Sequence, residues 1–301
     1  MRILITGGNG LLGQKLIKLI SEDNKHELLA TGRGPVRFPY DADYREMDIS
    51  DTGSVEQVFN NFKPEAVINT AAMTNVDQCE LNQSDCHVMN VEAVKILIAA
   101  CAKHDSFLLH LSTDFIFDGS HGPLREEESP GPVNYYGETK LEAEELIINS
   151  EIEWALARTV LVYGVVSDMS RSNIILWVRD SLKEGKTIRV VDDQWRTPTL
   201  AEDLADGCYR IVSQRASGIF NISGKDYLTP YQMAIYTADY FGLDKGLIEK
   251  TDSTEFKQPA ARPMKTGFVL EKAQKELGYE PHSFIEGIDI VARQVDSIHK
   301  N

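Results

Sequence analysis

The first half of the chain alternates short apolar runs with segments whose apolar residues follow a helical period. The runs Arg2–Thr6, Ala66–Thr70 and Phe107–Leu111 are largely apolar, which is typical of strands buried on both faces of a sheet. The same patterns predict further strands at 27–30 and 154–158 and helices at 11–20, 51–62, 84–103 and 134–148. This repetition of strand, helix and strand predicts a doubly wound parallel α/β sheet, the Rossmann arrangement, with helices on both faces.

The regularity fades after about Tyr163. Two apolar runs, Ile188–Val191 and Gly218–Ile222, predict strands. Residues 229–241 predict a helix with Thr229 at the N-cap and Pro230 at the first helical position. The rest of this half reads as charged and irregular. Ligands of doubly wound sheets bind outside the carboxyl ends of the strands, so we expect this half to form a smaller lobe that closes over that crevice.

We therefore expect two parts in the chain. Residues 1–163 are predicted to form the Rossmann domain, to which the chain returns around 186–222. Residues 164–301 are predicted to form mainly a substrate-binding lobe at the C-terminal end.

Composition narrows the classes of function. The chain has 301 residues, of which 42% are hydrophobic and 26% charged, as in an ordinary globular protein. Its 31 basic and 46 acidic residues give a net charge of −15, which disfavours nucleic acids and anionic membrane surfaces as partners. An anionic substrate must therefore be held by a local group of basic side chains and backbone N–H groups.

The sequence also lacks the features of membrane, secreted, disulfide-rich and metal-binding proteins. No apolar segment is long enough to span a bilayer, and the first apolar run is too short for a signal peptide, so we expect a cytoplasmic protein. The four cysteines form no CxxC pair, and the histidines are scattered. These spacings predict neither a disulfide framework nor a metal site.

A glycine-rich loop follows the first predicted strand. Its sequence is Gly-Gly-Asn-Gly-Leu-Leu-Gly, from Gly7 to Gly13, and a helix is predicted to start directly after it. Glycines at such a turn let a pyrophosphate approach the backbone and let the helix pack closely on the strand, while the helix N-terminus attracts the phosphates. A tight turn without a ligand is the alternative. The position in the first βαβ unit favours dinucleotide binding, with contacts from Gly7, Gly10, Leu11, Leu12 and Gly13.

The end of the second predicted strand bears on the choice of cofactor. An NAD-selective site places Asp or Glu there to bind the ribose hydroxyls. Here the stretch reads Thr-Gly-Arg-Gly, and Arg33 is placed to pair with a 2′-phosphate, so we predict NADP(H), with NAD(H) still open. The alternative is that Arg33 is a solvated surface residue. Asp48 and Ile49 are candidates for the adenine end, and Ala71 and Ala72 for a close approach of backbone to cofactor.

A tyrosine and a lysine four residues apart in a predicted helix are the candidates for catalysis. Tyr136 and Lys140 share one helix face, and Thr113 lies upstream at the carboxyl end of a predicted strand. A phenol near pKa 10 is a poor acid–base group at neutral pH. We expect the Lys140 ammonium and an oxidised nicotinamide to favour the phenolate and lower the pKa of Tyr136.

These motifs together resemble the extended short-chain dehydrogenase/reductase family, and the resemblance covers nearly the whole chain. Three segments, at 112–119, 134–140 and 193–199, are similar within that family to the dTDP-4-dehydrorhamnose reductases, and so is the Arg262-Pro263 pair. The resemblance implies NADPH-dependent reduction of a 4-keto nucleotide-diphosphate sugar, most closely dTDP-4-dehydrorhamnose to dTDP-L-rhamnose. It also implies membership of the dTDP-rhamnose biosynthesis pathway, and a homodimer is one open arrangement.

The resemblance also implies roles for individual residues. Tyr136 would protonate the developing alkoxide, Thr113 would hydrogen-bond the keto oxygen, and Lys140 would hold the nicotinamide ribose. The candidates for substrate binding are Asp114, Asn173 and Arg196. The guanidinium geometry of Arg196 suits a diphosphate. The alternative for Arg196 is an ion pair with the neighbouring Asp192 or Asp193.

Three other functions stay open. A nucleotide-sugar 4,6-dehydratase would carry a carboxylate pair after the threonine, but here Asp114 is followed by Phe115. A 4-epimerase must retain NAD, which Arg33 disfavours. A non-catalytic NADP-binding protein, similar to the regulatory subunit of methionine adenosyltransferase, need not keep Thr113, Tyr136 and Lys140 together. The stretch 160–172 differs from that of typical rhamnose-pathway reductases, so the identity of the sugar stays open.

Overall fold

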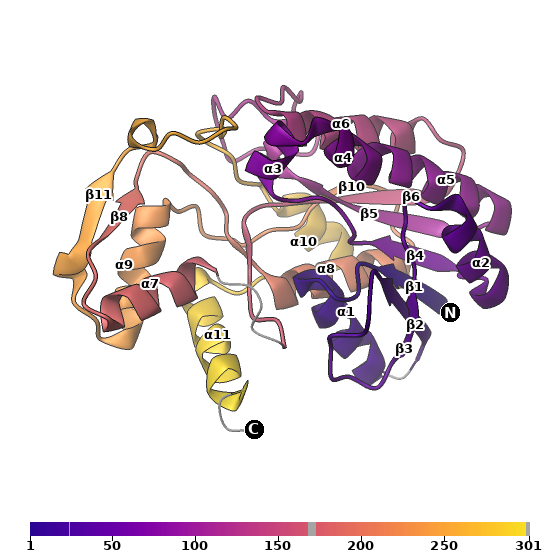
Figure 1. Cartoon of the computed structure of the whole chain (residues 1–301), viewed down its shortest axis with the longest axis horizontal. Coiled ribbons are helices and arrows are strands. Elements are labelled where there is room, and N and C mark those ends of the chain that lie inside the picture. The colour runs from indigo at the N-terminus through magenta and orange to yellow at the C-terminus, as the bar shows by residue number, and fades with distance from the viewer. Residues whose placement is uncertain (24, 168–172, 299–301) are drawn as a thin grey trace.

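The computed structural model describes residues 1–23, 25–167 and 173–298 (Figure 1). Its centre is a parallel sheet of seven strands in the order β10-β6-β5-β4-β1-β2-β3. The strands are β1 (Arg2–Thr6), β2 (Glu27–Gly32), β3 (Asp43–Glu46), β4 (Ala66–Asn69), β5 (Phe107–Thr113), β6 (Trp154–Thr159) and β10 (Gly218–Asn221). The order reverses between β1 and β4, which is where doubly wound sheets bind ligands. The predicted Rossmann sheet is confirmed.

Helices cover both faces of this sheet, as Figure 1 shows. One face carries α1 (Leu11–Asp23), α8 (Ala201–Gln214) and α10 (Glu271–Leu277), and the other carries α2 (Thr52–Phe62), α5 (Ala93–His104) and α6 (Tyr135–Ile148). Two short helices, α3 (Val76–Leu81) and α4 (Gln83–His87), lead through a π-helical segment at Val88–Glu92 into α5. The central strands are apolar on both sides because each side packs on one of these helical layers.

A second group of elements forms the lobe at the left of Figure 1. It contains α7 (Ile174–Lys183), α9 (Pro230–Phe241), α11 (Phe284–Ile298) and a two-stranded sheet of β8 (Ile188–Val191) and β11 (Ile248–Thr251). Helix α9 starts as its sequence predicts, with Thr229 and Gln232 forming a capping box ahead of Pro230. The short strands β7 (Val162–Tyr163) and β9 (Thr199–Leu200) pair with each other in parallel, and β9 leads directly into α8.

Within the segment 186–222, where the chain was expected to return to the Rossmann domain, β10 pairs with β6 in the central sheet, whereas β8 pairs with β11 in the lobe. In β8, Arg189 is exposed between buried Ile188 and Val190, a pattern of burial on one face that does not suit the middle of a parallel sheet. Much of the rest is not irregular but helical, in α8, α10 and α11. The division of the chain at residue 163 stays a prediction.

None of the helices in the described part of the chain is long and apolar enough to cross a membrane. Cys79, Cys86, Cys101 and Cys208 are all buried free thiols.

Candidate active site

The glycine loop connects β1 to α1 at the point where the strand order reverses. Gly7 has a φ of +69°, and a Cβ atom there would come within 2.7 Å of Thr70 Oγ1 and 2.9 Å of the Ala71 nitrogen. A Cβ atom on Gly13 would lie 2.4 Å from the Gly7 carbonyl oxygen. Gly7 therefore permits the turn beside β4, and Gly13 permits the close contact of α1 with the loop.

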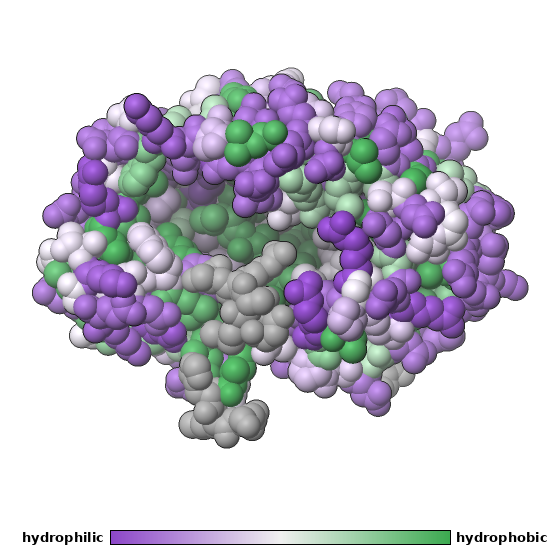
Figure 2. Space-filling view, in the orientation of Figure 1, coloured by the Kyte–Doolittle hydropathy of each residue, from purple (hydrophilic) through white to green (hydrophobic). Residues whose placement is uncertain are grey.

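A cavity of about 590 Å³ opens along the carboxyl ends of these strands. Figure 2 shows the face of the molecule hollowed between the sheet and the lobe, with apolar side chains in the floor of the hollow. Most of the residues predicted for the site line this one cavity: Gly7, Gly10, Leu11, Leu12, Arg33, Asp48, Ile49, Ala71, Ala72, Thr113, Asp114, Tyr136 and Lys140. The fold therefore brings the glycine loop and the Tyr–Lys pair, far apart in sequence, to one continuous space.

The loop after β2 provides two cations at one end of the cavity. Arg33 and Arg37 both line it. Asn9 of the glycine loop holds this segment, because its side chain donates to the Pro35 carbonyl at 3.0 Å and accepts from the Arg37 backbone nitrogen at 2.9 Å. Arg37 was not anticipated from the sequence, although it lies only four residues after Arg33.

Asp48 lies at the same end of the cavity. One of its carboxylate oxygens accepts from both the hydroxyl and the backbone nitrogen of Ser50, at 2.7 and 2.9 Å. These hydrogen bonds and the nearby Arg33 charge lower the pKa of Asp48, so it is an anion at neutral pH. An ionised Asp48 can accept from an amino group such as that of adenine, as the sequence predicts.

The three candidate catalytic residues come from two elements. Thr113 is the last residue of β5, while Tyr136 and Lys140 lie one turn apart on α6. Asn134 caps this helix, because its side chain accepts from the Gly137 nitrogen at 2.9 Å. All three side chains are more than nine-tenths buried: Thr113 is 7% exposed, Tyr136 8% and Lys140 2%. Their low exposure shows that they line the deep part of the cavity rather than its rim.

The electrostatics of Tyr136 differ from the expectation. Burial raises the pKa of the phenol, and the hydrogen bond with Thr113 lowers it only in part. The expected lowering of the Tyr136 pKa by Lys140 does not occur in the protein without cofactor, because the cost of removing the phenolate from water outweighs the other interactions. Tyr136 is therefore a protonated phenol at neutral pH, which is the form that can donate a proton.

Lys140 is fixed by two hydrogen bonds inside the protein. Its Nζ atom lies 2.6 Å from the Leu111 carbonyl oxygen and 2.9 Å from Nε2 of His110. Burial lowers the pKa of Lys140 to about 8, and Glu144 and Cys86 oppose that lowering. Its charge can therefore change close to neutral pH. The role of His110 could not be anticipated, because it is one polar residue in an otherwise apolar strand.

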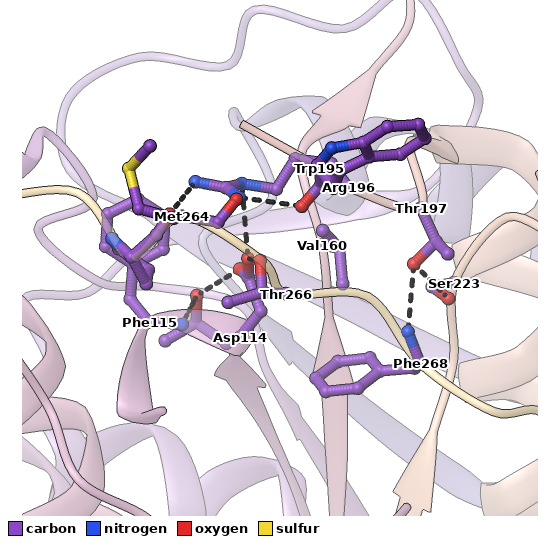
Figure 3. A network of polar contacts seen from close by, with 12 residues as sticks. Asp114, Phe115, Val160, Trp195, Arg196, Thr197, Ser223, Met264, Thr266 and Phe268 are labelled. Atoms are coloured by element: carbon purple, nitrogen blue, oxygen red, sulfur yellow. Dashed lines mark hydrogen bonds and ion pairs between the residues drawn. The ribbon is translucent and has the colours of Figure 1, made fainter. Parts of the chain in front are cut away.

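Asp114 follows Thr113 and joins β5 to two distant segments (Figure 3). Its carboxylate accepts a short hydrogen bond from the Thr266 hydroxyl and lies 3.7 Å from Nε of Arg196. Thr113 Oγ1 lies 3.2 Å from the other carboxylate oxygen. Burial raises the pKa of Asp114, and the Arg196 charge partly offsets that rise. This network fixes the position of Thr113 relative to the segment around Thr266.

Three predicted residues, Gly13, Asn173 and Arg196, are not among those that line the cavity. The Arg196 guanidinium donates to the carbonyl oxygens of Trp195, Pro263 and Met264 at 2.6 to 3.2 Å. It forms its ion pair with Asp114, not with Asp192 or Asp193.

The Asn173 side chain caps α7 by accepting from two backbone nitrogens, and it donates to the Gly164 carbonyl at 2.7 Å. A contact of either residue with a substrate stays a prediction, and it would require these internal bonds to be exchanged.

One further observation bears on whether the cavity fits a dinucleotide. Ser112 lines it, and the buried Ser112 hydroxyl has no hydrogen-bond partner among the described residues. A buried hydroxyl without a partner is costly, and a polar ligand group in the cavity would satisfy it. With the side-chain-free surface at Gly7 and the cations at Arg33 and Arg37, the cavity fits a phosphate-bearing dinucleotide. No group of three or more His, Cys, Asp or Glu suited to a metal occurs among the described residues.

The parallel sheet, the glycine loop and the Tyr136–Lys140 pair define an extended short-chain dehydrogenase/reductase. The chain belongs to the RmlD substrate binding domain family, whose family model matches residues 1–297.

Known relatives of two kinds match it. The chain is 30% identical to a dTDP-4-dehydrorhamnose reductase of Aggregatibacter actinomycetemcomitans over 292 residues, 93% of this chain and 94% of that protein. It is 31% identical to methionine adenosyltransferase 2 subunit beta of Bos taurus over 247 residues, 80% of this chain and 72% of that protein. The crystal structure of a dTDP-4-dehydrorhamnose reductase from Clostridium acetobutylicum superposes with a TM-score of 0.87 at 27% identity, covering 98% of this chain and 100% of that one.

Proposed function

We propose that the protein reduces the 4-keto group of a nucleotide-diphosphate sugar with NADPH, most closely the conversion of dTDP-4-dehydrorhamnose to dTDP-L-rhamnose. The observation that carries the proposal is that Thr113, Tyr136 and Lys140 line the same cavity as the glycine loop. A dinucleotide on that loop would extend along the strand ends toward the Tyr136 phenol. Similarity over more than nine-tenths of both chains to a dTDP-4-dehydrorhamnose reductase supports the choice of reaction.

The buried side chains suit proton transfer to a carbonyl oxygen. NADPH, when bound, supplies the hydride. Tyr136 is protonated at neutral pH and can give its proton to the oxygen that becomes an alcohol. The Thr113 hydroxyl donates to Asp114 in the protein without substrate, and by turning its single O–H group it can donate a hydrogen bond to the same oxygen instead. Lys140 can donate to ribose hydroxyls from its fixed place against Leu111.

Preference for NADPH over NADH is part of the proposal. Arg33 and Arg37 both line the cavity, and no carboxylate stands at the end of β2, where Gly32 is the last residue. Two guanidinium groups favour a 2′-phosphate, whereas an NAD site would use an acid for the ribose hydroxyls. Use of NADH at lower affinity is compatible with this arrangement.

A regulatory function is the second candidate, because methionine adenosyltransferase 2 subunit beta of Bos taurus is 31% identical to this chain. A protein that only binds NADP needs no acid in its cavity. Here Thr113, Tyr136 and Lys140 stay together and buried, which favours the enzyme. A dehydratase is disfavoured because Phe115 stands where a second carboxylate would be needed, and an epimerase because Arg33 disfavours a retained NAD.

Partners and location follow from the same proposal. The substrate is a nucleotide-diphosphate sugar, with Asp114 on the cavity wall and Asn173 and Arg196 as the further candidates for contact. We propose a cytoplasmic location and keep a homodimer as a prediction. The net charge of −15 disfavours nucleic acid as a partner.

Oxidation of NADPH in the presence of dTDP-4-dehydrorhamnose tests this function, with NADH and with dTDP-glucose as controls. We expect NADPH oxidation and a dTDP-L-rhamnose product identified by NMR, and no oxidation with dTDP-glucose, which has no keto group. Tight NADPH binding without turnover of any 4-keto sugar nucleotide would favour the regulatory candidate. In that case, stable association with a methionine adenosyltransferase catalytic subunit is the positive result to seek.

A further inference from the structure

The loop between β2 and β3 carries two arginines that have no acidic partner among the described residues. Most of the described arginines form ion pairs with Asp or Glu, whereas Arg33, Arg37 and Arg45 form none with a described residue. Of these three, only Arg33 and Arg37 line the cavity. In a chain with a net charge of −15, two cations without a counter-ion favour an anionic ligand at this place.

This loop has little packing of its own to hold it in one shape. Pro35 and Val36 are exposed, and Gly34 has a φ of +70° with no described atom within 4 Å of the place where a Cβ atom would be. Phe38 fixes the far end, because it is buried and its ring packs edge-on against Tyr44. A ligand that had to order the exposed part of such a loop would bind more weakly, because ordering costs entropy.

Asn9 of the glycine loop holds the exposed part of this loop. Its Nδ2 atom donates to the Pro35 carbonyl and to the Tyr44 hydroxyl, both at 3.0 Å, and its Oδ1 atom accepts from the Arg37 nitrogen at 2.9 Å. These partners fix the orientation of the carboxamide, because a carbonyl oxygen only accepts and a backbone nitrogen only donates. Both amide protons are used, so the Asn9 side chain has no donor left for a phosphate.

Tyr44 on β3 completes this arrangement. Its hydroxyl accepts from Asn9 and donates to the Gly34 carbonyl at 2.7 Å. Burial raises the pKa of Tyr44, so the phenol keeps the proton that it donates. Asn9 and Tyr44, together called the clamp, therefore bind the backbone of the loop at three residues that lie between or beside the two arginines.

We propose that the clamp sets the selectivity of the site for a 2′-phosphate, by holding the loop so that Arg33 and Arg37 act on the same anion. This inference rests on the proposed preference for NADPH and adds two residues that determine it. Asn9 and Tyr44 are positioning residues, because they act on the ligand only through the loop. A loop held before the cofactor binds benefits only a cofactor with a 2′-phosphate, since NADH has no group for the two cations.

A purely structural role of the clamp predicts a different outcome. If Asn9 only stabilised the glycine loop, its loss would weaken NADPH and NADH equally, because both cofactors carry the same pyrophosphate. If Asn9 positions the two cations, its loss weakens NADPH alone. The ratio of the NADH dissociation constant to the NADPH dissociation constant separates the two roles, and it is called the selectivity ratio below.

Fluorescence titration of both cofactors into two variants tests the proposal. Asn9→Ala removes the hydrogen bonds of the carboxamide, and Tyr44→Phe removes those of the phenol while keeping its ring against Phe38. We expect each variant to bind NADPH about fivefold or more weakly and NADH within about twofold of the wild type. Circular dichroism confirms that each variant is folded. An unchanged selectivity ratio in the folded variants would overturn the proposal.

Asn149→Ala and Tyr240→Phe are the matched controls. The Asn149 side chain donates to the Glu145 carbonyl at 2.8 Å at the end of α6, and the Tyr240 hydroxyl donates to Asp289 at 2.7 Å in the lobe. Neither residue lines the cavity of the glycine loop. Both variants should keep the wild-type selectivity ratio. A control that lowered the ratio as much as Asn9→Ala would count against the proposal.

A mutant cycle shows whether Asn9 acts through the two arginines. In a protein that already carries Arg33→Ala and Arg37→Ala, we expect Asn9→Ala to leave the selectivity ratio unchanged, because no cation remains to be positioned. A further fall of the ratio in that background would mean that Asn9 acts on the 2′-phosphate directly, and it would overturn the positioning role.

This inference and the proposed function fail separately. A lower selectivity ratio on removal of the arginines, with an unchanged ratio in Asn9→Ala and Tyr44→Phe, would overturn only the role of the clamp. An unchanged ratio on removal of both arginines would overturn the preference for NADPH and the clamp with it. A protein that shows the expected ratios but reduces no keto sugar nucleotide would overturn the reductase function and support the clamp, because the measurement is of binding.

Discussion

Arg262 and Asp77 form a two-point ion pair that fastens the segment containing Pro263 and Met264 to helix α3. The two guanidinium nitrogens of Arg262 lie 2.6 and 2.9 Å from the two carboxylate oxygens of Asp77, across 185 residues of sequence. The same segment supplies the carbonyl oxygens that bind Arg196. The pair therefore helps to hold together the network around Asp114, at the edge of the cavity.

The contribution of this pair to stability should be small but measurable. Both side chains are partly exposed, so we expect a double-mutant cycle of Arg262→Ala and Asp77→Ala to give a coupling of about 1 kcal/mol in the free energy of unfolding. The hydrogen bond from Arg262 lowers the pKa of Asp77 below its unfolded value. The stabilisation is therefore present above the unfolded pKa and is lost as pH falls through the folded pKa. Urea unfolding at pH 7 and near pH 3 checks this. A coupling that grows toward pH 3 would contradict it.

Gly13 provides a direct test of the glycine loop. In Gly13→Ala, the new Cβ atom would lie 2.4 Å from the Gly7 carbonyl oxygen and 2.7 Å from the Gly8 Cα atom, so the loop must move. We expect at least a tenfold loss of NADPH affinity in fluorescence titrations, together with a lower melting temperature. Gly53→Ala in α2 is the control, because its Cβ atom meets only Asp51 Oδ1, at 3.4 Å. It should leave affinity unchanged. Equal affinities in both variants would refute a dinucleotide on this loop.

Arg33 tests the preference for the 2′-phosphate. A charge-assisted hydrogen bond of this kind contributes about 1.5 to 3 kcal/mol, so Arg33→Ala should weaken NADPH binding roughly tenfold or more. NADH binding should change little, because NADH has no 2′-phosphate. Arg189→Ala in β8 removes the same charge from the lobe and should alter neither affinity. The ratio of the two dissociation constants is the quantity to compare, and an unchanged ratio in Arg33→Ala would argue that Arg37 alone, or neither cation, selects the cofactor.

How far the sequence predicts the fold depends on where each strand lies. Apolar strands such as β1 and β4 were predicted because both of their faces are buried. Strand β3 (Asp43–Glu46) was missed, because this edge strand is largely exposed and contains no apolar run. Helix α8 was missed although Leu204, Cys208 and Ile211 are buried on one face, since charged residues among them obscured the period.

The candidate site was predictable where its chemistry is local. The glycine loop and the Tyr136–Lys140 pair each lie within a few residues, and the structure places both on the same cavity. Contacts between distant segments could not be anticipated. Arg196 was expected to face a diphosphate, but its partners are Asp114 and carbonyl oxygens near Pro263, which only the folded chain brings to it. The contact of His110 with Lys140 likewise depends on how α6 packs on β5.

Tyr136→Phe shows whether the Tyr136 hydroxyl donates the proton during reduction. The phenol is buried and protonated, and its hydroxyl acts on the transition state more than on bound cofactor. We expect turnover of dTDP-4-dehydrorhamnose to fall by at least a hundredfold, while the dissociation constant of NADPH stays within a few-fold of the wild-type value. Full turnover in Tyr136→Phe, or a loss of activity that is explained entirely by lost NADPH binding, would mean that Tyr136 is not the proton donor.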